Sequence, residues 1–171
     1  MTTNRARKLA GAMAKANGQS FEAQLELLSA AYARHGFMEL CKRYEPYKRV
    51  SGSGGSTFRA VYAGKSGCDF EIWLCDGRAG HLEAKSREAE RIPKDALDEA
   101  QQAQLQRRVD WGQLALVLVR LQGVWYMVNY ARWHDGDRKS HNHEQLAEIG
   151  WKLKVNDGIP DLMTPLLVHA D

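Results

Sequence analysis

Long apolar runs are absent from this sequence of 171 residues. No stretch approaches the roughly 20 apolar residues that a membrane-spanning helix needs. The opening segment, MTTNRARKLAGAMAK, is basic but has no sustained apolar region of the kind that secretory signals contain. We therefore expect a cytoplasmic protein with no membrane partner. An organelle transit peptide is the alternative for this basic start, although the start runs directly into the pattern of a helix.

Cysteine is also scarce. The three cysteines, Cys41, Cys68 and Cys75, are an odd number and show no CxxC spacing. The sequence therefore suggests neither a disulfide framework nor a structural zinc site, and we expect reduced thiols that pack as small apolar groups. A composition of 44% hydrophobic and 26% charged residues is typical of one globular domain with a substantial core, so we predict a single domain over residues 1–171.

Positive charge is distributed unevenly along the chain. Residues 1–20 carry a net charge of +4 and residues 41–66 carry +5, so a total of +3 leaves −6 for the remainder. Clustered cations are what phosphate contacts need, and the pattern indicates a footprint for a polyanion such as DNA. A solvated charge run explains the same pattern and is the alternative. The candidate DNA-binding cations are Arg5, Arg7, Lys8, Lys42, Arg43, Lys48, Arg49, Arg59 and Lys65.

Residues 20–36 have the spacing of an amphipathic helix. Phe21, Leu25, Leu28 and Tyr32 recur at helical intervals, and Gly36 is a natural stop. A possible strand at residues 37–44 follows. Residues 44–65 then read as an insertion with basic and tyrosine side chains on both sides of a glycine-serine tip, which suits an arm that grips nucleic acid. A mobile hairpin loop is the alternative.

The stretch from Asp69 to Lys85 has the pattern of a hairpin. The segment DFEIWL alternates apolar and polar residues, and DGRAG supplies turn chemistry. On the return strand Glu83 and Lys85 share one face, because side chains two apart in a strand point the same way. A turn near Gly77 and Arg78 places Asp69 across from these two residues.

Two carboxylates and an ammonium at one point suit metal-assisted hydrolysis of a phosphodiester. Asp69, Glu83 and the backbone carbonyl of Ala84 supply the hard oxygen ligands that Mg²⁺ prefers, with Mn²⁺ as the alternative ion. Lys85 is then placed to orient a water or to stabilise developing negative charge. A salt-bridge trio on the surface of a hairpin is the bland interpretation of the same residues.

The arrangement around these residues resembles the PD-(D/E)xK nuclease superfamily and, within it, the RecU-type Holliday junction resolvases. The resemblance extends over nearly the whole chain. Its elements are NGQSFE at residues 17–22, Asp69, the Glu83-Ala84-Lys85 triplet, IPKDALDEAQQAQL at 92–105, LALVLVRL at 114–121, VWYMVNYARW at 124–133 and GIPDLM at 158–163.

The resemblance implies a restriction-endonuclease-like α/β fold, in which a mixed central sheet is flanked by helices. We expect one of these helices from about Asp95 to Arg108, and a C-terminal segment that packs back against the sheet. It assigns Glu22 to the metal site and Gln101 to the catalytic residues, and it places residues 44–65 where the family has a stalk that grips the junction. Taken alone, Glu22 is an ordinary acid in the first turn of a helix. The chain departs from the family pattern at Ala100, where a histidine is frequent, and both Gln102 and Gln104 lie close enough to Gln101 to compete for its role.

The activity implied is metal-dependent resolution of four-way DNA junctions by paired symmetric nicks, in a bacterial or phage-infected cell. Because a four-way junction presents equivalent strands in pairs, a two-fold homodimer is expected. A related nuclease that acts on duplex DNA in restriction or repair is the nearest alternative. A DNA-binding domain without catalysis is the alternative from another class.

Two further features of the sequence need an interpretation. Glu71 follows Asp69 closely and is either a supporting group or a substitute ligand for the metal. The segment WHDGDRKSHNH at residues 133–143 contains three histidines and two aspartates, the residue types that bind zinc. No helical or hairpin spacing fixes these ligands, so we expect a surface loop, with Arg138 and Lys139 available to contact phosphate.

Overall fold

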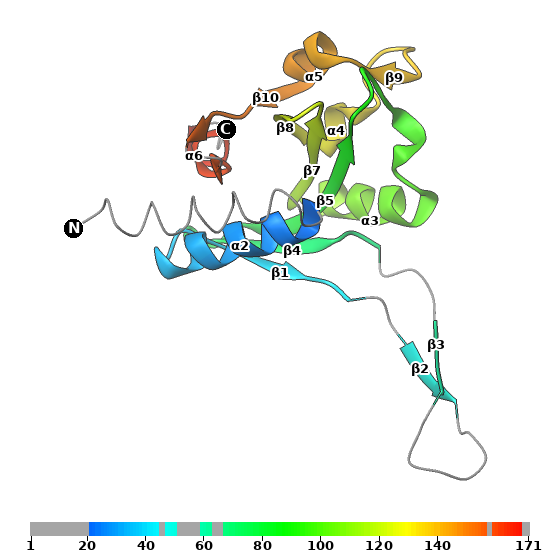
Figure 1. The fold of residues 1–171 in the computed structure, drawn as a ribbon, viewed down its shortest axis with the longest axis vertical. Coiled ribbons are helices and arrows are strands. Elements are labelled where there is room, and N and C mark those ends of the chain that lie inside the picture. Colours follow the sequence, from blue (N-terminus) through cyan, green and yellow to red (C-terminus); the bar gives the residue numbers. More distant parts are fainter. Residues whose placement is uncertain (1–20, 45–46, 51–58, 63–66, 157–158, 169–171) are drawn as a thin grey trace.

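A six-stranded sheet forms the centre of the structure (Figure 1). The computed structural model describes residues 21–44, 47–50, 59–62, 67–156 and 159–168, with the backbone alone described at 22, 23, 47–50, 59–62 and 168. The strands of the central sheet are β1 (Met38–Lys42), β4 (Phe70–Leu74), β5 (Ala79–Arg87), β7 (Leu114–Leu121), β8 (Val124–Asn129) and β10 (Gly150–Lys152).

The sheet is mixed. Its order is β1-β4-β5-β7-β8-β10, and every neighbouring pair is antiparallel except β5 and β7, which run parallel. The connection between these two parallel strands contains a helix, as a crossover of this kind requires. The predicted fold class, a mixed central sheet flanked by helices, is confirmed.

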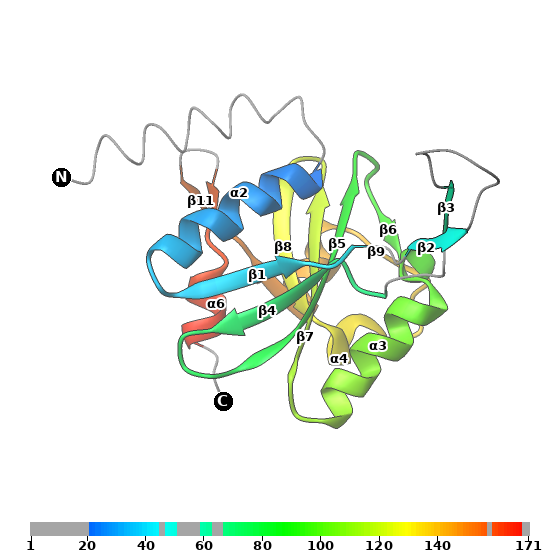
Figure 2. The same cartoon turned by 90° about the horizontal axis from the view of Figure 1, so that it is seen from below.

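Helices cover both faces of the sheet. They are α2 (Phe21–Arg34), α3 (Glu99–Asp110), α4 (Tyr130–Trp133), α5 (His143–Ile149) and α6 (Met163–Val168). Helix α2 lies along β1, whereas α3 lies beside β5 and β7 (Figure 2). The alternation of β7 divides its apolar side chains between two cores, because Leu116 and Leu118 face the α2 side while Val117 and Val119 face the α3 side.

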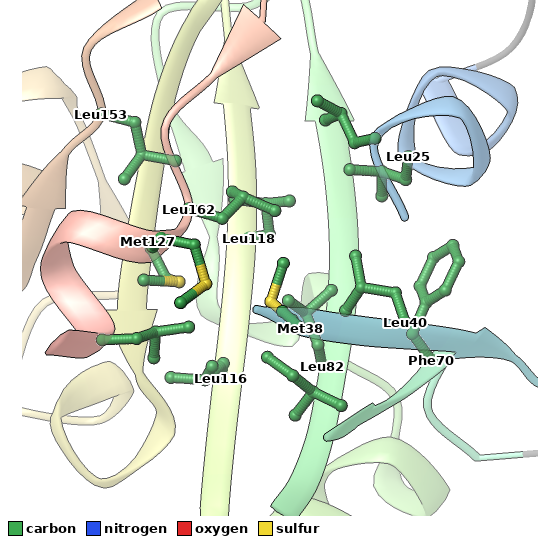
Figure 3. Packing of buried hydrophobic residues seen from close by; sticks show 14 of the residues in the cluster. Leu25, Met38, Leu40, Phe70, Leu82, Leu116, Leu118, Met127, Leu153 and Leu162 are labelled. Atoms are coloured by element: carbon green, nitrogen blue, oxygen red, sulfur yellow. The ribbon is translucent and has the colours of Figure 1, made fainter. Parts of the chain in front are cut away.

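The core beneath α2 is formed by the apolar stripe that the sequence predicts (Figure 3). Leu25 and Leu28 are completely buried, and they pack with Leu118, Met127 and Leu162. Each such leucine contributes roughly 1.5–3 kcal/mol relative to an exposed position. The helix over residues 20–36 and the packing of the C-terminal segment against the sheet are therefore confirmed within the described residues.

The helix after β5 starts later than the sequence predicts. We expect a helix from about Asp95 to Arg108, but a single 3₁₀ turn covers Lys94–Ala96 and α3 begins only at Glu99. The break has a local cause, because the side chain of Asp98 accepts hydrogen bonds from the amides of Ala100 and Gln101 and thereby caps the helix.

The predicted insertion at residues 44–65 contains a two-stranded antiparallel ladder. Its strands are β2 (Tyr47–Val50) and β3 (Arg59–Tyr62), with Val50 opposite Arg59. The ladder is a sheet of its own and lies apart from the central sheet, in the lower part of Figure 1. The glycine-serine tip between the strands and the predicted basic arm at residues 1–16 fall outside the described residues.

Two further short ladders complete the described secondary structure. They pair β6 (Ile92–Pro93) with β9 (Ser140–His141) and β11 (Val155–Asn156) with β12 (Ile159–Pro160). Among the described helices, none combines the length and the apolar character needed to cross a membrane.

The thiols differ from the expectation. Cys68 is completely buried, but Cys41 and Cys75 are exposed. Cys41 points outward because it occupies an alternate position of β1, whose burial pattern is strictly two-periodic over its first four residues.

Candidate active site

Two acidic side chains meet at the open end of the β4–β5 hairpin. Phe70 pairs with Leu82 in the ladder, which places Asp69 beside Glu83. The backbone amide of Asp69 donates to Oε2 of Glu83 at 3.1 Å, and the amide of Ala84 donates to Oδ2 of Asp69 at 3.0 Å. The backbone of Asp69 thus binds the Glu83 side chain, and the backbone next to Glu83 binds the Asp69 side chain.

Lys85 and Gln101 complete this cluster. The ammonium Nζ of Lys85 lies 2.7 Å from Oε1 of Glu83, and Nε2 of Gln101 donates to the same oxygen at 2.6 Å. Oε1 of Gln101 in turn accepts from Nζ of Lys85 at 3.1 Å. The Glu83 side chain is 1% exposed and that of Lys85 is 22% exposed, so the cluster is open to solvent on its Lys85 side.

The environment of Glu83 favours its protonated form. Burial, followed by the negative charge of Asp69, raises the pKa of Glu83 from an ordinary 4.5 to about 8. The hydrogen bond and the charge of Lys85 act in the opposite direction but are outweighed. Any additional positive charge that enters the site therefore stabilises the ionised form of Glu83.

The start of α3 fixes the orientation of Gln101. Asp98 and Gln101 form a capping box, in which Asp98 accepts from the Gln101 amide at 3.0 Å and Oε1 of Gln101 accepts from the Asp98 amide at 3.0 Å. The same carboxamide that closes the helix start therefore reaches Glu83 and Lys85. The other candidate, Gln102, instead donates to the carbonyl of Leu97 at 2.7 Å.

Gln104 holds the chain immediately before Asp69, a contact that the sequence does not predict. Its Oε1 accepts from the amide of Cys68 at 2.8 Å. Gly67 is required beside it, because its φ is +82° and a Cβ there would lie 1.6 Å from Oε1 of Gln104. The only trace of this role in the sequence is spacing: Gln101 and Gln104 are three apart and share a helix face.

The first turn of α2 is anchored at the Lys85 end of β5. Arg120 pairs with Ser86 across the β5–β7 ladder. Its guanidinium lies 5.3 Å from the centroid of the Phe21 ring and donates to Oε1 of Gln24 at 3.1 Å. Glu22 lies in this turn, but its side chain is outside the described part of the structure, so its assignment to the metal site stays a prediction.

The predicted DNA-binding cations differ in their surroundings. Lys42 forms an ion pair with Glu26 at 2.8 Å, and Nε of Arg43 lies 3.7 Å from Oε1 of Glu71. The amide of Arg43 also donates to the carbonyl of Asp69 at 2.8 Å, so the insertion begins beside the site. Outside the described residues or side chains lie Arg5, Arg7, Lys8, Lys48, Arg49, Arg59 and Lys65.

Glu71 lies next to the cluster but makes different contacts. It is opposite His81 in the ladder, and its Oε1 is 3.9 Å from Nε2 of that buried imidazole. Burial, then the charges of Arg108 and Arg43, lower the pKa of His81 to about 4. Glu71 thus supports its neighbours and makes no described contact with Asp69 or Glu83.

The histidine-rich segment does not form a metal site within the described residues. No group of three or more His, Cys, Asp or Glu side chains is placed there to hold an ion. His141 is buried, with Nε2 2.9 Å from the carbonyl of Trp133, and Nδ1 of His143 lies 2.9 Å from the hydroxyl of Tyr126. Arg138, offered as a phosphate contact, pairs with Glu148 at 2.9 Å.

The residues of the main cluster fit a hard divalent cation. Asp69 and Glu83 supply two adjacent carboxylates, and burial followed by the negative charge of Asp69 raises the pKa of Glu83, so a cation bound here would favour the ionised form of Glu83. Mg²⁺ suits a site of this kind because it binds few protein carboxylates and retains several waters. The described side chains supply two acidic ligands, and Glu22 is the candidate for a third.

Comparison with known proteins gives a structural likeness at low sequence identity. No protein-family model matches the sequence, and a search of curated proteins finds no match. Among solved structures, the chain is similar to Hjc of Archaeoglobus fulgidus, a Holliday junction resolvase from an archaeal hyperthermophile. The TM-score is 0.43 at 16% identity, covering 73% of this chain and 89% of that one.

Proposed function

We propose that this protein is a metal-dependent endonuclease that cuts DNA at four-way junctions, in the manner of the RecU-type resolvases that its sequence resembles. One observation carries the proposal: Asp69 immediately before β4, Glu83 and Lys85 of β5, and Gln101 of α3 form one hydrogen-bonded cluster. A surface salt-bridge trio needs neither the complete burial of Glu83 nor a helix capped by the same glutamine.

Each residue of the cluster has a proposed role. Asp69, Glu83, the carbonyl of Ala84 and Glu22 hold Mg²⁺, or Mn²⁺ in its place. The ion, when bound, supplies charge stabilisation and an acidified water. Lys85 orients the attacking water and stabilises negative charge on the phosphate, since its ammonium is both fixed by Glu83 and open to solvent. Gln101 fixes the direction of the Glu83 and Lys85 side chains.

The β2–β3 arm supports a DNA substrate with a branch. Because the amide of Arg43 bonds to the carbonyl of Asp69, the arm departs beside the cluster, and Lys48, Arg49 and Arg59 lie on its two strands. An arm of this kind suits the open centre of a junction better than the closed surface of a duplex. A two-fold dimer would carry one cluster to each of two equivalent strands.

The test is cleavage of a labelled four-way junction and of a linear duplex with the same arm sequences, each with Mg²⁺ and with chelator. We expect metal-dependent cuts on the junction and much slower cutting of the duplex. Equal rates on both substrates would favour the duplex nuclease. Binding without any cut, in either metal, would leave a DNA-binding domain.

A further inference from the structure

A second pair of polar side chains lies two residues nearer the turn of the β4–β5 hairpin than Asp69 and Glu83. Glu71 on β4 is opposite His81 on β5, and this pair shares a face with Asp69 and Glu83 because side chains two apart point the same way. The two positions are about 7 Å apart, the span of two strand residues. A cavity opens at the second position, lined in part by Glu71, Trp73, His81 and Arg108.

Arg108 is held in a fixed orientation at this cavity. Its Nη1 donates to Oε1 of Gln113 at 2.7 Å, and its Nη2 lies 2.9 Å from Nε2 of His81. The ring centroid of Trp111 lies 5.1 Å from the guanidinium carbon. Because a guanidinium can only donate, Nε2 of His81 accepts this hydrogen bond and the imidazole carries its proton on Nδ1.

The positive charge of Arg108 is not matched by a carboxylate. Its described partners are an imidazole, a carboxamide and an indole ring, all neutral, and among the described residues no carboxylate oxygen lies within 4.0 Å of its guanidinium. The acidic group that lines the cavity, Glu71, instead faces Arg43 and His81. A partly buried cation without an anionic partner is unfavourable, so the arrangement favours the binding of an anion.

Stability alone does not explain the arrangement. Nδ1 of His81, a residue that is 2% exposed, and Nε of Arg108 are both buried without a hydrogen-bond partner among the described residues. Buried N–H groups without acceptors cost free energy, and native structures retain few of them. Buried polar groups without partners are typical of functional sites, where a ligand and not stability accounts for their arrangement.

We propose that Arg108 binds a phosphate of the cleaved DNA strand, adjacent to the phosphate that is cut at Asp69 and Glu83. This assignment rests on the proposed nuclease function. The span of about 7 Å between the two positions is comparable to the separation of neighbouring phosphates on one strand. Trp73, which is 52% exposed and lines the same cavity, offers a flat apolar surface to the sugar or base between them.

The first test measures the salt dependence of DNA binding without metal, for Arg108→Gln and for Arg107→Gln. Arg107 is the matched control because it is the preceding residue of α3 and is exposed. Removal of one phosphate contact lowers the slope of log affinity against log salt by about 0.9 on duplex DNA. We expect that change for Arg108→Gln alone. Equal slopes in the two variants would overturn the assignment. Arg108→Lys should keep the slope and bind DNA more weakly, because lysine retains the positive charge but lacks the planar guanidinium that can donate two parallel hydrogen bonds.

The second test separates this site from the nuclease function. Inorganic phosphate is titrated into the metal-free protein while the Nε–H resonances of the arginine side chains are followed by NMR. The Arg108 resonance should shift in a saturable way and that of Arg107 should not; the absence of a saturable Arg108 shift would overturn the anion site. Neither test involves cleavage, so a protein that cuts junctions but fails both tests refutes this site alone. A protein that passes the phosphate titration but never cuts DNA refutes the nuclease function and leaves an anion site.

Discussion

Gln101 donates a 2.6 Å hydrogen bond from the first turn of α3 to the completely buried carboxylate of Glu83 on β5. The helix that crosses over between the two parallel strands is thereby coupled to the acidic cluster. Because Gln101 also accepts from Lys85 and from the amide of Asp98, one carboxamide sets both the helix start and the direction of the charged side chains. Its removal is therefore expected to affect chemistry more than folding.

We predict that Gln101→Ala lowers the rate of DNA cleavage by about 10-fold or more, since misplacement of a catalytic group by about 1 Å can cost 10²-fold. Gln102→Ala is the matched control, because it also removes a hydrogen bond near the start of α3. The two variants should unfold at similar temperatures, and Gln102→Ala should cleave at the wild-type rate. Equal losses of activity would show that the effect is one of helix stability.

Lys85→Ala and Asp69→Asn should lose cleavage by at least about 10²-fold, the range for removal of a group that stabilises developing charge. Both should retain most of their affinity for DNA, because affinity comes mainly from phosphate contacts. Gel-shift titration and single-turnover cleavage measure the two quantities on one substrate. Lys152→Ala, at an exposed lysine of β10, is the control for removal of one positive charge. Full activity in either folded variant would remove the proposed site.

The stability of the metal-free protein should fall as pH rises from 6.5 to 8. Glu83 has a pKa of about 8 in the folded protein and an ordinary value of 4.5, so the folded state retains a proton that the unfolded state has released. Stability contributed by this proton is complete below pH 4.5 and is lost as pH rises toward 8. The slope is at most about 1.4 kcal/mol per pH unit. Measurement above pH 6.5 avoids His81, whose lowered pKa instead costs stability at acidic pH.

Urea unfolding in the presence of chelator, across that pH range, provides the measurement. Glu83→Gln should flatten the dependence, whereas Glu90→Gln, at an exposed position with a similar change in charge, should not. A flat wild-type profile between pH 6.5 and 8 would mean that Glu83 is already ionised in the folded protein.

The predicted DNA-binding cations should not contribute equally to DNA affinity. Replacement of Lys48 and Arg49 by alanine should lower the salt slope of DNA binding by about 0.9 for each phosphate that the variant no longer neutralises. Lys42→Ala should have a smaller effect, because Lys42 already pairs with Glu26. Affinity measured at several salt concentrations, with chelator present, distinguishes these cases. If Lys42→Ala changes the slope as much as the double variant, the ion pair with Glu26 is broken when DNA binds.

The parts of the site that could be predicted from sequence are those determined by strand periodicity. The two-residue repeat places Glu83 and Lys85 on one face, and the glycine-containing turn sets the hairpin register that brings Asp69 to them. The contribution of α3 could not be predicted in the same way. Its start depends on a capping box, and the choice among Gln101, Gln102 and Gln104 depends on how the helix is rotated against the sheet.

Long-range pairings were equally inaccessible from sequence. The neutral imidazole of His81 accepts from Arg108, 27 residues away, and no local pattern indicates that contact. In the histidine-rich segment the predicted surface loop is confirmed at the exposed residues 134–139, but His141 is buried against Trp133 and is not part of that loop. Composition identifies candidate ligands, but only the packing of separate elements decides which of them meet.

The number of active sites that act together is also open to experiment. The described part of one chain offers one acidic cluster around Asp69 and Glu83, whereas resolution of a junction needs two cuts, so we expect a two-fold dimer that makes paired nicks at symmetric positions. Active protein is mixed with excess Lys85→Ala protein, and subunits are allowed to exchange before a labelled junction is added. Heterodimers should nick one strand and leave its partner intact, so nicked junctions should accumulate in place of resolved products.

Mixing with excess Lys152→Ala protein is the control, because a variant that keeps its cluster should leave the paired cuts unchanged. Sizing of the wild-type protein, free and bound to the junction, establishes whether two subunits are present when the cuts are made. If Lys85→Ala protein lowers the yield of paired cuts without producing nicked junctions, the subunits have not exchanged. Each cutting dimer then contains only one kind of subunit. If a monomer resolves junctions by itself, the dimer mechanism is wrong and a duplex nuclease that acts one strand at a time becomes the better explanation.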